Sequence, residues 1–143
     1  MEKMEWLSQS ADETVSIAKE IAKKIKPGTV IALSGNLGSG KTTFIKGLAE
    51  GFGLKDHNQV TSPTFALMHI YPSKPQINHF DLYRLESVKE VQDIGFEEFI
   101  SDSNVVTCVE WAEKAASLMP KDVLKINFEV LGESLRKISM DPR

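Results

Sequence analysis

The chain contains the stretch Gly35-Asn36-Leu37-Gly38-Ser39-Gly40-Lys41-Thr42-Thr43, and this stretch decides the fold. It follows residues 29–34, an apolar run of strand length, and it leads into residues 44–49, which read as a helix. The pattern G-x-x-x-x-G-K-[ST] between a strand and a helix is typical of a phosphate-binding loop. Glycines let successive backbone N–H groups point at phosphate oxygens, and the positive end of the following helix dipole adds to that field. The sequence therefore predicts a nucleotide site here.

Two side chains of this loop have separate predicted roles. We expect Lys41 to reach the β and γ phosphates of a nucleotide, and the hydroxyl of Thr42 to bind Mg²⁺, because this hard cation prefers oxygen ligands. A glycine-rich turn with a coincidental lysine is the structural alternative, and the strand before and the helix after the loop count against it. The predicted nucleotide-binding residues of the loop are Asn36, Leu37, Gly38, Ser39, Gly40, Lys41, Thr42 and Thr43.

The bulk composition is that of an ordinary globular domain. The chain has 143 residues, of which 41% are hydrophobic and 26% charged, so we expect one domain with a real core. No apolar run approaches the roughly 18 residues of a membrane span, and the first residues are too polar for a signal peptide. We therefore expect a cytoplasmic protein that does not bind a membrane. Cys108 is the only cysteine, and its apolar surroundings predict a buried core thiol.

The charge balance argues against direct gripping of a nucleic acid. The net charge is −3, and among 17 basic residues only Arg84, Arg136 and Arg143 are arginines. A protein that binds a nucleic-acid backbone usually has a clustered basic face, and the lysines here are spread along the chain. A role near RNA would therefore run through a protein partner.

Hydrophobic periodicity and turn signals predict the remaining elements. Helices are expected at residues 11–25, 88–94, 96–100 and 112–118, and strands at residues 4–7, 66–71, 76–81, 104–109, 123–130 and 134–140. Strand 104–109 is a continuous β-branched run, which is typical of a strand buried in a parallel sheet. The other late strands alternate and should pair as antiparallel hairpins. The predicted fold class is α/β: a single three-layer domain of the P-loop NTPase type over residues 1–143, with a mainly parallel central sheet and appended antiparallel hairpins.

Two carboxylates are candidates for the metal. Asp81 and Glu110 each end an apolar-rich strand, and ligands in open α/β sheets lie outside the carboxyl ends of strands. A phosphate loop needs a neighbouring carboxylate to hold Mg²⁺ or to polarise water. We expect both to face the site, with Glu110 as the direct metal ligand and Asp81 supporting it. The alternative for either acid is a helix cap or loop carboxylate.

Three further residues lie near these acids. His79 and Tyr83 alternate with Asp81, so the three would share one face of an extended strand. A structural imidazole is favoured over a base for His79. Trp111 directly follows Glu110, where packing is favoured over stacking on a base or a partner.

Hydroxyl groups crowd around Pro63, which makes an ordinary central strand improbable there. Thr61, Ser62 and Thr64 either form a Ser/Thr turn or form a switch-like loop that senses the γ phosphate or the metal. The spacing supports both interpretations equally.

Three rival functions use the same phosphate loop. A kinase usually brings several arginines over the transferred phosphoryl group, and this chain has few. A GTPase would carry the N-K-x-D pattern, which is absent. A non-catalytic ATP-gated binding module stays open, because binding and hydrolysis use the same loop.

Four segments together resemble the bacterial TsaE (YjeE) family of small ATPases. These are the phosphate loop, Val60-Thr61-Ser62-Pro63-Thr64-Phe65, His79-Phe80-Asp81-Leu82-Tyr83-Arg84-Leu85 and Val109-Glu110-Trp111. The resemblance covers nearly the whole chain in motif order and spacing. Two positions depart from it: the family often has Asp where this chain has Asn36, and Ala where it has Ser39.

The resemblance implies a Mg²⁺-dependent ATPase that is slow alone and faster when docked. It implies a role in threonylcarbamoyladenosine modification of the tRNA adenosine 3′ of the anticodon, with the proteins TsaD and TsaB as partners and tRNA reached only through their complex. ATP and Mg²⁺ are the implied cofactors. The implied catalytic residues are Glu110, Asp81 and Lys41, the implied metal ligands are Thr42 and Glu110, and Trp111 would lie beside the nucleotide.

Overall fold

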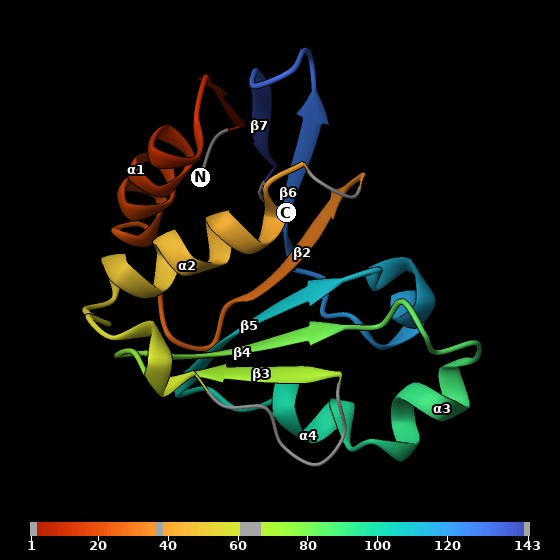
Figure 1. Cartoon of the computed structure of the whole chain (residues 1–143). Coiled ribbons are helices and arrows are strands. Elements are labelled where there is room, and N and C mark those ends of the chain that lie inside the picture. Colours follow the sequence, from red (N-terminus) through yellow and green to blue (C-terminus); the bar gives the residue numbers. More distant parts are fainter. Residues whose placement is uncertain (1–2, 37–38, 61–66, 142–143) are drawn as a thin grey trace.

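The computed structural model describes residues 3–36, 39–60 and 67–141, and the strands found there form one seven-stranded sheet (Figure 1). The strands are β1 (Met4–Ser8), β2 (Val30–Gly35), β3 (Met68–Tyr71), β4 (Gln76–Asp81), β5 (Val105–Glu110), β6 (Leu124–Val130) and β7 (Arg136–Asp141). The helices are α1 (Ala11–Ala22), α2 (Lys41–Gly51), α3 (Val88–Asp93) and α4 (Phe96–Ile100), with 3₁₀ segments η1 (His57–Gln59) and η2 (Ala112–Leu118).

The sheet has a parallel centre and antiparallel edges, in the order β1-β7-β6-β2-β5-β4-β3. β2 pairs in parallel with β5 and β6, and β4 pairs in parallel with β5. β3 is antiparallel to β4, while β7 is antiparallel to β6 and β1. This arrangement confirms the predicted α/β class with its central parallel strands, both hairpins and the short edge strand.

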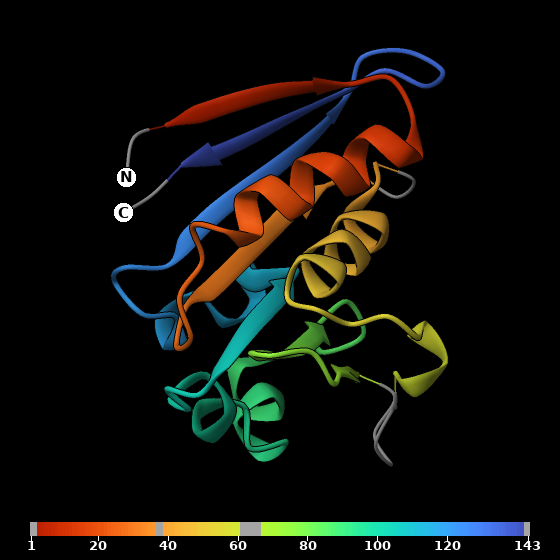
Figure 2. The same ribbon diagram turned by 90° about the vertical axis from the view of Figure 1, so that its left-hand side faces the viewer.

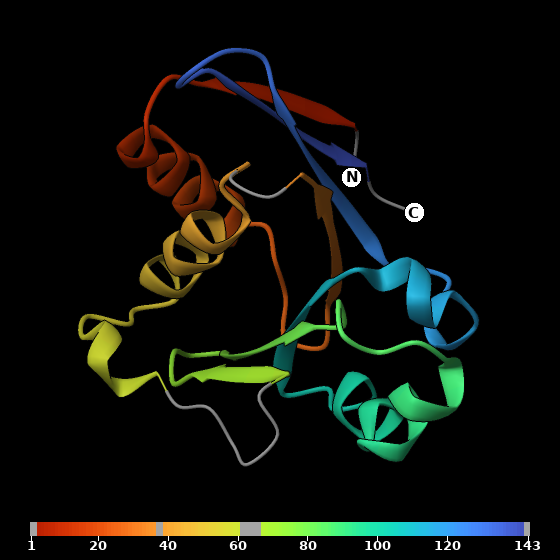
Figure 3. The same cartoon turned by 45° about the vertical axis from the view of Figure 1, so that its right-hand side comes forward.

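Helices cover both faces of the sheet (Figures 2 and 3). α1 and α2 pack on one face, where Ile31 of β2 and Val106 of β5 join their apolar side chains. α3, α4 and η2 lie on the other face, where Val109 of β5 belongs to a second apolar cluster. Every residue of β5 is buried, as expected for a central parallel strand. The predicted burial of Cys108 is confirmed, and this burial raises the pKa of its thiol.

Two helices differ from the sequence prediction. α1 begins after Ser10, whose hydroxyl accepts a hydrogen bond from the Glu13 N–H, but it ends at Ala22 and not at residue 25. The next three backbone N–H groups bond to carbonyls three residues earlier, which tightens the last turn into 3₁₀ geometry. Residues 112–118 likewise form 3₁₀ structure, broken at Ala115. Within the described ranges, no helix has the length and apolar character needed to cross a bilayer.

The contact between α1 and α2 depends on a glycine. A Cβ atom added to Gly47 of α2 would lie 2.6 Å from the Cβ of Ala18 and 2.9 Å from the carbonyl oxygen of Val15 on α1. Only a residue without a side chain lets the helices approach this closely. Because α2 begins at Lys41, this contact also helps to fix the position of that residue.

The Gly47→Val variant should lower the free energy of unfolding by about 1–3 kcal/mol, because overpacking forces the two helices apart. Urea denaturation followed by circular dichroism measures this change. Lys46→Val is the matched control: it introduces the same side chain into the same helix at an exposed position. Equal losses of stability in both variants would contradict the close-packing argument.

Candidate functional site

The predicted phosphate loop joins β2 to α2 through glycines in backbone conformations that other residues avoid. Gly35 has a φ of +142° and Gly40 a φ of +102°. A Cβ atom on Gly35 would lie 2.6 Å from the carbonyl oxygen of Phe128 on β6, so a side chain is excluded there. The Lys41 side chain turns back along the loop, and its Nζ donates a hydrogen bond to the Gly35 carbonyl oxygen at 2.8 Å. The lysine therefore links the two ends of the loop.

A buried charged cluster lies beside this loop, at the end of β5. The Nζ of Lys41 lies 3.3 Å from Oε1 of Glu110, and Nε2 of His79 lies 2.6 Å from Oε2 of the same carboxylate. Lys41 and Glu110 are each 7% exposed, and His79 is 5% exposed. Both oxygens of one buried carboxylate thus have partners, on two elements far apart in the sequence.

This cluster keeps Glu110 ionised. Burial by itself raises the pKa of the Glu110 carboxyl, because a low-dielectric interior disfavours the charged form. The hydrogen bond and charge of His79, together with the Lys41 ammonium, outweigh burial and hold the pKa below its ordinary value. Glu110 is therefore a carboxylate at neutral pH and can bind a metal or accept a hydrogen bond from water.

Asp81 ends β4 at the same edge of the sheet. Asp81 and Glu110 each end a strand, as predicted, and the parallel register of these two strands pairs the two acids with each other. The Oδ1 of Asp81 accepts a hydrogen bond from the Tyr83 N–H at 3.0 Å and closes a turn. Because the chain turns there, the prediction that Tyr83 continues the face of the strand is wrong, and its side chain is 58% exposed.

Trp111 follows Glu110 with a φ of +60°, an unusual conformation for a residue with a side chain. Its ring lies 5.1 Å from that of Tyr83, and Nζ of Lys114 lies over both rings. Trp111 also lines a cavity of about 210 Å³ that contains Asn36 and Lys41. It therefore packs against a neighbour and at the same time borders the phosphate loop.

A second cavity of about 210 Å³ lies on the other side of the loop, towards β6 and β7. It is lined by Ser10, Ala11, Thr14, Gly40, Thr43, Glu133, Ser134 and Arg136. Nη1 of Arg136 donates to the carbonyl oxygens of Gly132 and Leu135 at 3.0 and 3.2 Å, which shapes the connection between the last two strands. The sequence left open whether Arg136 touches a nucleotide, and it did not predict the other lining residues outside the loop, because the start of α1 and the β6–β7 turn come together only when the sheet forms.

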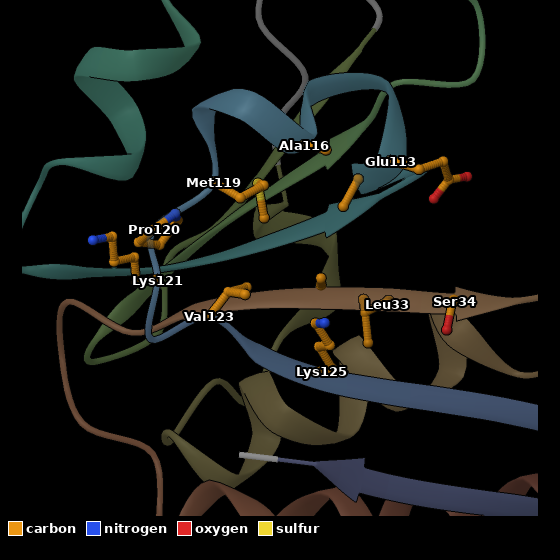
Figure 4. Close-up of a pocket in the computed structure, with 11 residues that line it drawn as sticks. Leu33, Ser34, Glu113, Ala116, Met119, Pro120, Lys121, Val123 and Lys125 are labelled. Atoms are coloured by element: carbon orange, nitrogen blue, oxygen red, sulfur yellow. The ribbon is translucent and has the colours of Figure 1, made fainter. Parts of the chain in front are cut away.

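A larger cavity lies elsewhere, between η2 and the sheet face formed by β2 and β6 (Figure 4). It measures about 600 Å³, with mostly apolar walls, and Figure 4 shows Glu113 at one end and Lys121 at the other. Neither Lys41 nor Glu110 lines it. Its size alone therefore does not make it the nucleotide site.

The remaining predicted residues divide into two groups. Thr42 is exposed in the first turn of α2, and the Ser39 hydroxyl is buried without a hydrogen-bond partner among the described residues. Leu37, Gly38, Thr61, Ser62 and Thr64 lie outside the described residues, and their roles stay predictions. Within the described ranges, no three His, Cys, Asp or Glu side chains form a metal site on their own. A metal here would depend on a hydroxyl, one or two carboxylates and phosphate oxygens, which is how Mg²⁺ is usually bound.

The Lys41→Met variant should raise the pKa of Glu110, because it removes a cation that favours the ionised form. Folding lowers this pKa, so ionisation of Glu110 adds to the free energy of unfolding at pH values above the pKa that the carboxyl has in the unfolded chain. This contribution is lost as the pH falls through the folded-state pKa. In the variant, the contribution of Glu110 to the free energy of unfolding should be smaller. A ¹³C NMR titration of the carboxyl measures the pKa, with Lys46→Met on the exposed face of α2 as control. An unchanged pKa would show that the 3.3 Å contact does not persist in solution.

Comparisons with known proteins agree over nearly the whole chain. The family model "Threonylcarbamoyl adenosine biosynthesis protein TsaE" matches residues 8–138. The TsaE protein of Treponema pallidum is 36% identical over 96% of this chain and 99% of its own length, and that of Bacillus subtilis is 38% identical over 97% and 85%. The crystal structure of Bacillus subtilis YdiB superposes with a TM-score of 0.74 at 33% identity, covering 97% of this chain and 84% of that one. The chain therefore belongs to the TsaE family of threonylcarbamoyl adenosine biosynthesis proteins.

Proposed function

We propose that the protein is a Mg²⁺-dependent ATPase of tRNA threonylcarbamoyladenosine biosynthesis, which acts on a complex of TsaB and TsaD and allows it to turn over. Family membership supports the pathway, since the relatives carry the name tRNA threonylcarbamoyladenosine biosynthesis protein TsaE. One observation carries the ATPase activity: a buried, ionised Glu110 in contact with the lysine of a phosphate-binding loop.

The contact between Lys41 and Glu110 indicates how phosphate would enter. Lys41 lies 2.8 Å from the Gly35 carbonyl oxygen and 3.3 Å from the carboxylate, so its ammonium is already held at the mouth of the loop. A triphosphate carries more negative charge than one carboxylate and can draw the ammonium away from Glu110. The freed Oε1 of Glu110 then becomes available to accept a hydrogen bond from an attacking water or to bind the metal.

The residues present fit Mg²⁺. The exposed hydroxyl of Thr42 and the carboxylate of Glu110 are hard oxygen donors, and Asp81 stands beside Glu110 in the register of the sheet. When bound, Mg²⁺ would neutralise charge on the β and γ phosphates. Thr61, Ser62 and Thr64 complete the proposal as the switch-like loop.

The two small cavities give the nucleotide a direction. Glu110 lies on the β5 side of β2, so the γ phosphate would point that way. The cavity that includes Gly40 and Thr43 lies on the opposite, β6 side, and its 210 Å³ offers room beside the loop for ribose and base. ATP would therefore lie across the start of α2, with its base between α1 and the β6–β7 turn.

A kinase reading gains no support from the site. Arg84 is exposed beyond β4, and Arg136 lines the cavity on the β6 side. The described residues contain these two arginines. Neither of them lines the cavity beside Lys41 and Trp111. The charges there would come from Lys41 and the metal, which suits transfer of phosphate to water.

Hydrolysis of ATP by the purified protein, alone and with TsaB and TsaD, tests the function. We expect the protein alone to release phosphate from ATP slowly, and the rate of release to rise when both proteins are added. GTP should be a poor substrate. The Glu110→Gln variant should still bind ATP but hydrolyse it about 10²- to 10⁴-fold more slowly, because it loses the carboxylate that activates water. Lys41→Ala should instead weaken ATP binding.

The control for Glu110→Gln is Glu113→Gln, which changes an exposed carboxylate that borders the cavity beside Lys41 and Trp111. No effect of TsaB and TsaD on the rate would remove the partner-coupled mechanism. If a non-hydrolysable ATP analogue supports many rounds of tRNA modification, the protein is an ATP-gated binding module and the proposed hydrolysis has no role.

The direction of the nucleotide can be tested by filling each cavity. The Ala11→Trp variant should weaken ATP binding at least about tenfold, since loss of base contacts worth about 1.4 kcal/mol has that effect, and should leave tripolyphosphate binding unchanged. Ala116→Trp places the same side chain in the 600 Å³ cavity and should change neither. Isothermal titration calorimetry measures both ligands. If Ala116→Trp weakens ATP binding and Ala11→Trp does not, the base lies in the larger cavity.

A further inference from the structure

We propose that His79 is a positioning residue that holds the Glu110 carboxylate in the orientation needed for hydrolysis, without touching the nucleotide itself. The inference rests on the proposed ATPase function and adds a residue to it. The sequence alone favours a structural imidazole at this position, and the geometry around Glu110 gives that imidazole a more specific task.

The two oxygens of Glu110 have partners of different kinds. Oε1 faces Lys41 at 3.3 Å, and Oε2 lies 2.6 Å from Nε2 of His79. The Lys41 contact is the one that a phosphate would replace, because the same ammonium serves both anions. The His79 contact lies on the other oxygen and can persist when Lys41 turns away. Among the described residues, it is then the remaining hydrogen-bond partner of this side chain.

The position of His79 makes it a support for Glu110 and not a base for substrate. His79 pairs with Cys108 in the register between β4 and β5, two residues before Glu110, so the hydrogen bond runs diagonally across two parallel strands. The carboxylate lies between the imidazole and Lys41. His79 is also 5% exposed, which keeps water and substrate away from its ring.

The rest of the imidazole is held by packing. The ring of His69 lies 5.9 Å away and that of Tyr71 lies 6.5 Å away, both on β3. Nδ1 of His79 is buried and has no hydrogen-bond partner among the described residues. A buried histidine with a purely structural role would be expected to satisfy both nitrogens. Among the described residues, the hydrogen bond of the ring goes to the Glu110 carboxylate, which ties the orientation of the imidazole to that of the acid.

The experiment compares two substitutions of His79 in the full chain. His79→Leu keeps a comparable bulk and removes the donor, while His79→Gln keeps an N–H group near the position of Nε2. We expect His79→Leu to lower kcat for ATP hydrolysis about 10- to 100-fold, the usual effect of losing a partner that orients a metal ligand, and to raise the Mg²⁺ concentration needed for half the maximal rate. The ATP dissociation constant should change less than about twofold. His79→Gln should recover most of kcat.

His69→Leu is the matched control, because this neighbouring ring lies near that of His79 on β3 but forms no hydrogen bond with Glu110 in the described part of the chain. It should leave kcat within about twofold of wild type, well inside the tenfold that 1.4 kcal/mol represents. A purely structural role would make His79→Leu and His79→Gln lose stability and activity together. Equal losses of kcat in these two variants, or an unchanged kcat in His79→Leu, would overturn the proposal.

A second measurement needs no nucleotide and separates this inference from the proposed function. Imidazole ¹⁵N shifts of the ligand-free protein at neutral pH report which ring nitrogen carries a proton. We expect a proton on Nε2 of His79, with a shift that changes in Glu110→Gln. A ring protonated only at Nδ1 could not donate to Glu110 and would overturn the proposal, whatever the ATPase assay shows. If wild type hydrolyses no ATP while the Nε2 proton is found, the proposed function fails and the contact stands.

Discussion

The buried carboxylate of Glu110 is the constraint on which the site depends. An ionised group in a protein interior is strongly unfavourable unless nearby charges and hydrogen bonds compensate for the lost water. Here the compensation comes from Lys41 at the start of α2 and from His79 on β4. Removing either partner would leave charge buried without support. The positions of Lys41 at the start of α2 and of His79 on β4 are therefore needed to stabilise the buried charge of Glu110 on β5.

The parallel centre of the sheet makes this coupling possible. β2, β5 and β4 lie next to one another and point the same way, so their carboxyl ends meet at one edge. The register places Leu33 beside Glu110, and Glu110 beside Asp81. On the face of the sheet that α1 and α2 cover, the close approach at Gly47 packs α2 against α1 and keeps Lys41 near that edge. Rigid elements thus carry each charged group, as the proposed function would require of a preorganised site.

Under the proposed function, the carboxylate would let one loop serve both a nucleotide-free and a nucleotide-bound state. In the resting chain the ammonium of Lys41 is neutralised by Glu110 and by the Gly35 carbonyl oxygen. Under the proposed function, exchange of these partners for phosphate would involve a rotation of the lysine side chain, and Gly35 and Gly40 at the two ends of the loop already have positive φ angles. Trp111, which follows Glu110 in the chain, borders the cavity that Lys41 also lines and packs against exposed Tyr83. It therefore connects the surroundings of Glu110 with the protein surface.

The sequence by itself determined the features that depend on local patterns. These were the glycine-rich loop with Lys41, the β-branched run of β5, the succession of strands and helices along the chain, and the two acids at strand ends. Each of these features depends on residues that are neighbours in the sequence. Tertiary structure alone decided which distant groups meet. The turn after Asp81 moved Tyr83 off the strand, the parallel pairing of β4 with β5 brought His79 to Glu110, and the sheet order joined α1 to the β6–β7 turn. Local periodicity carries no information about strand order, and contacts between strands arise only once that order exists.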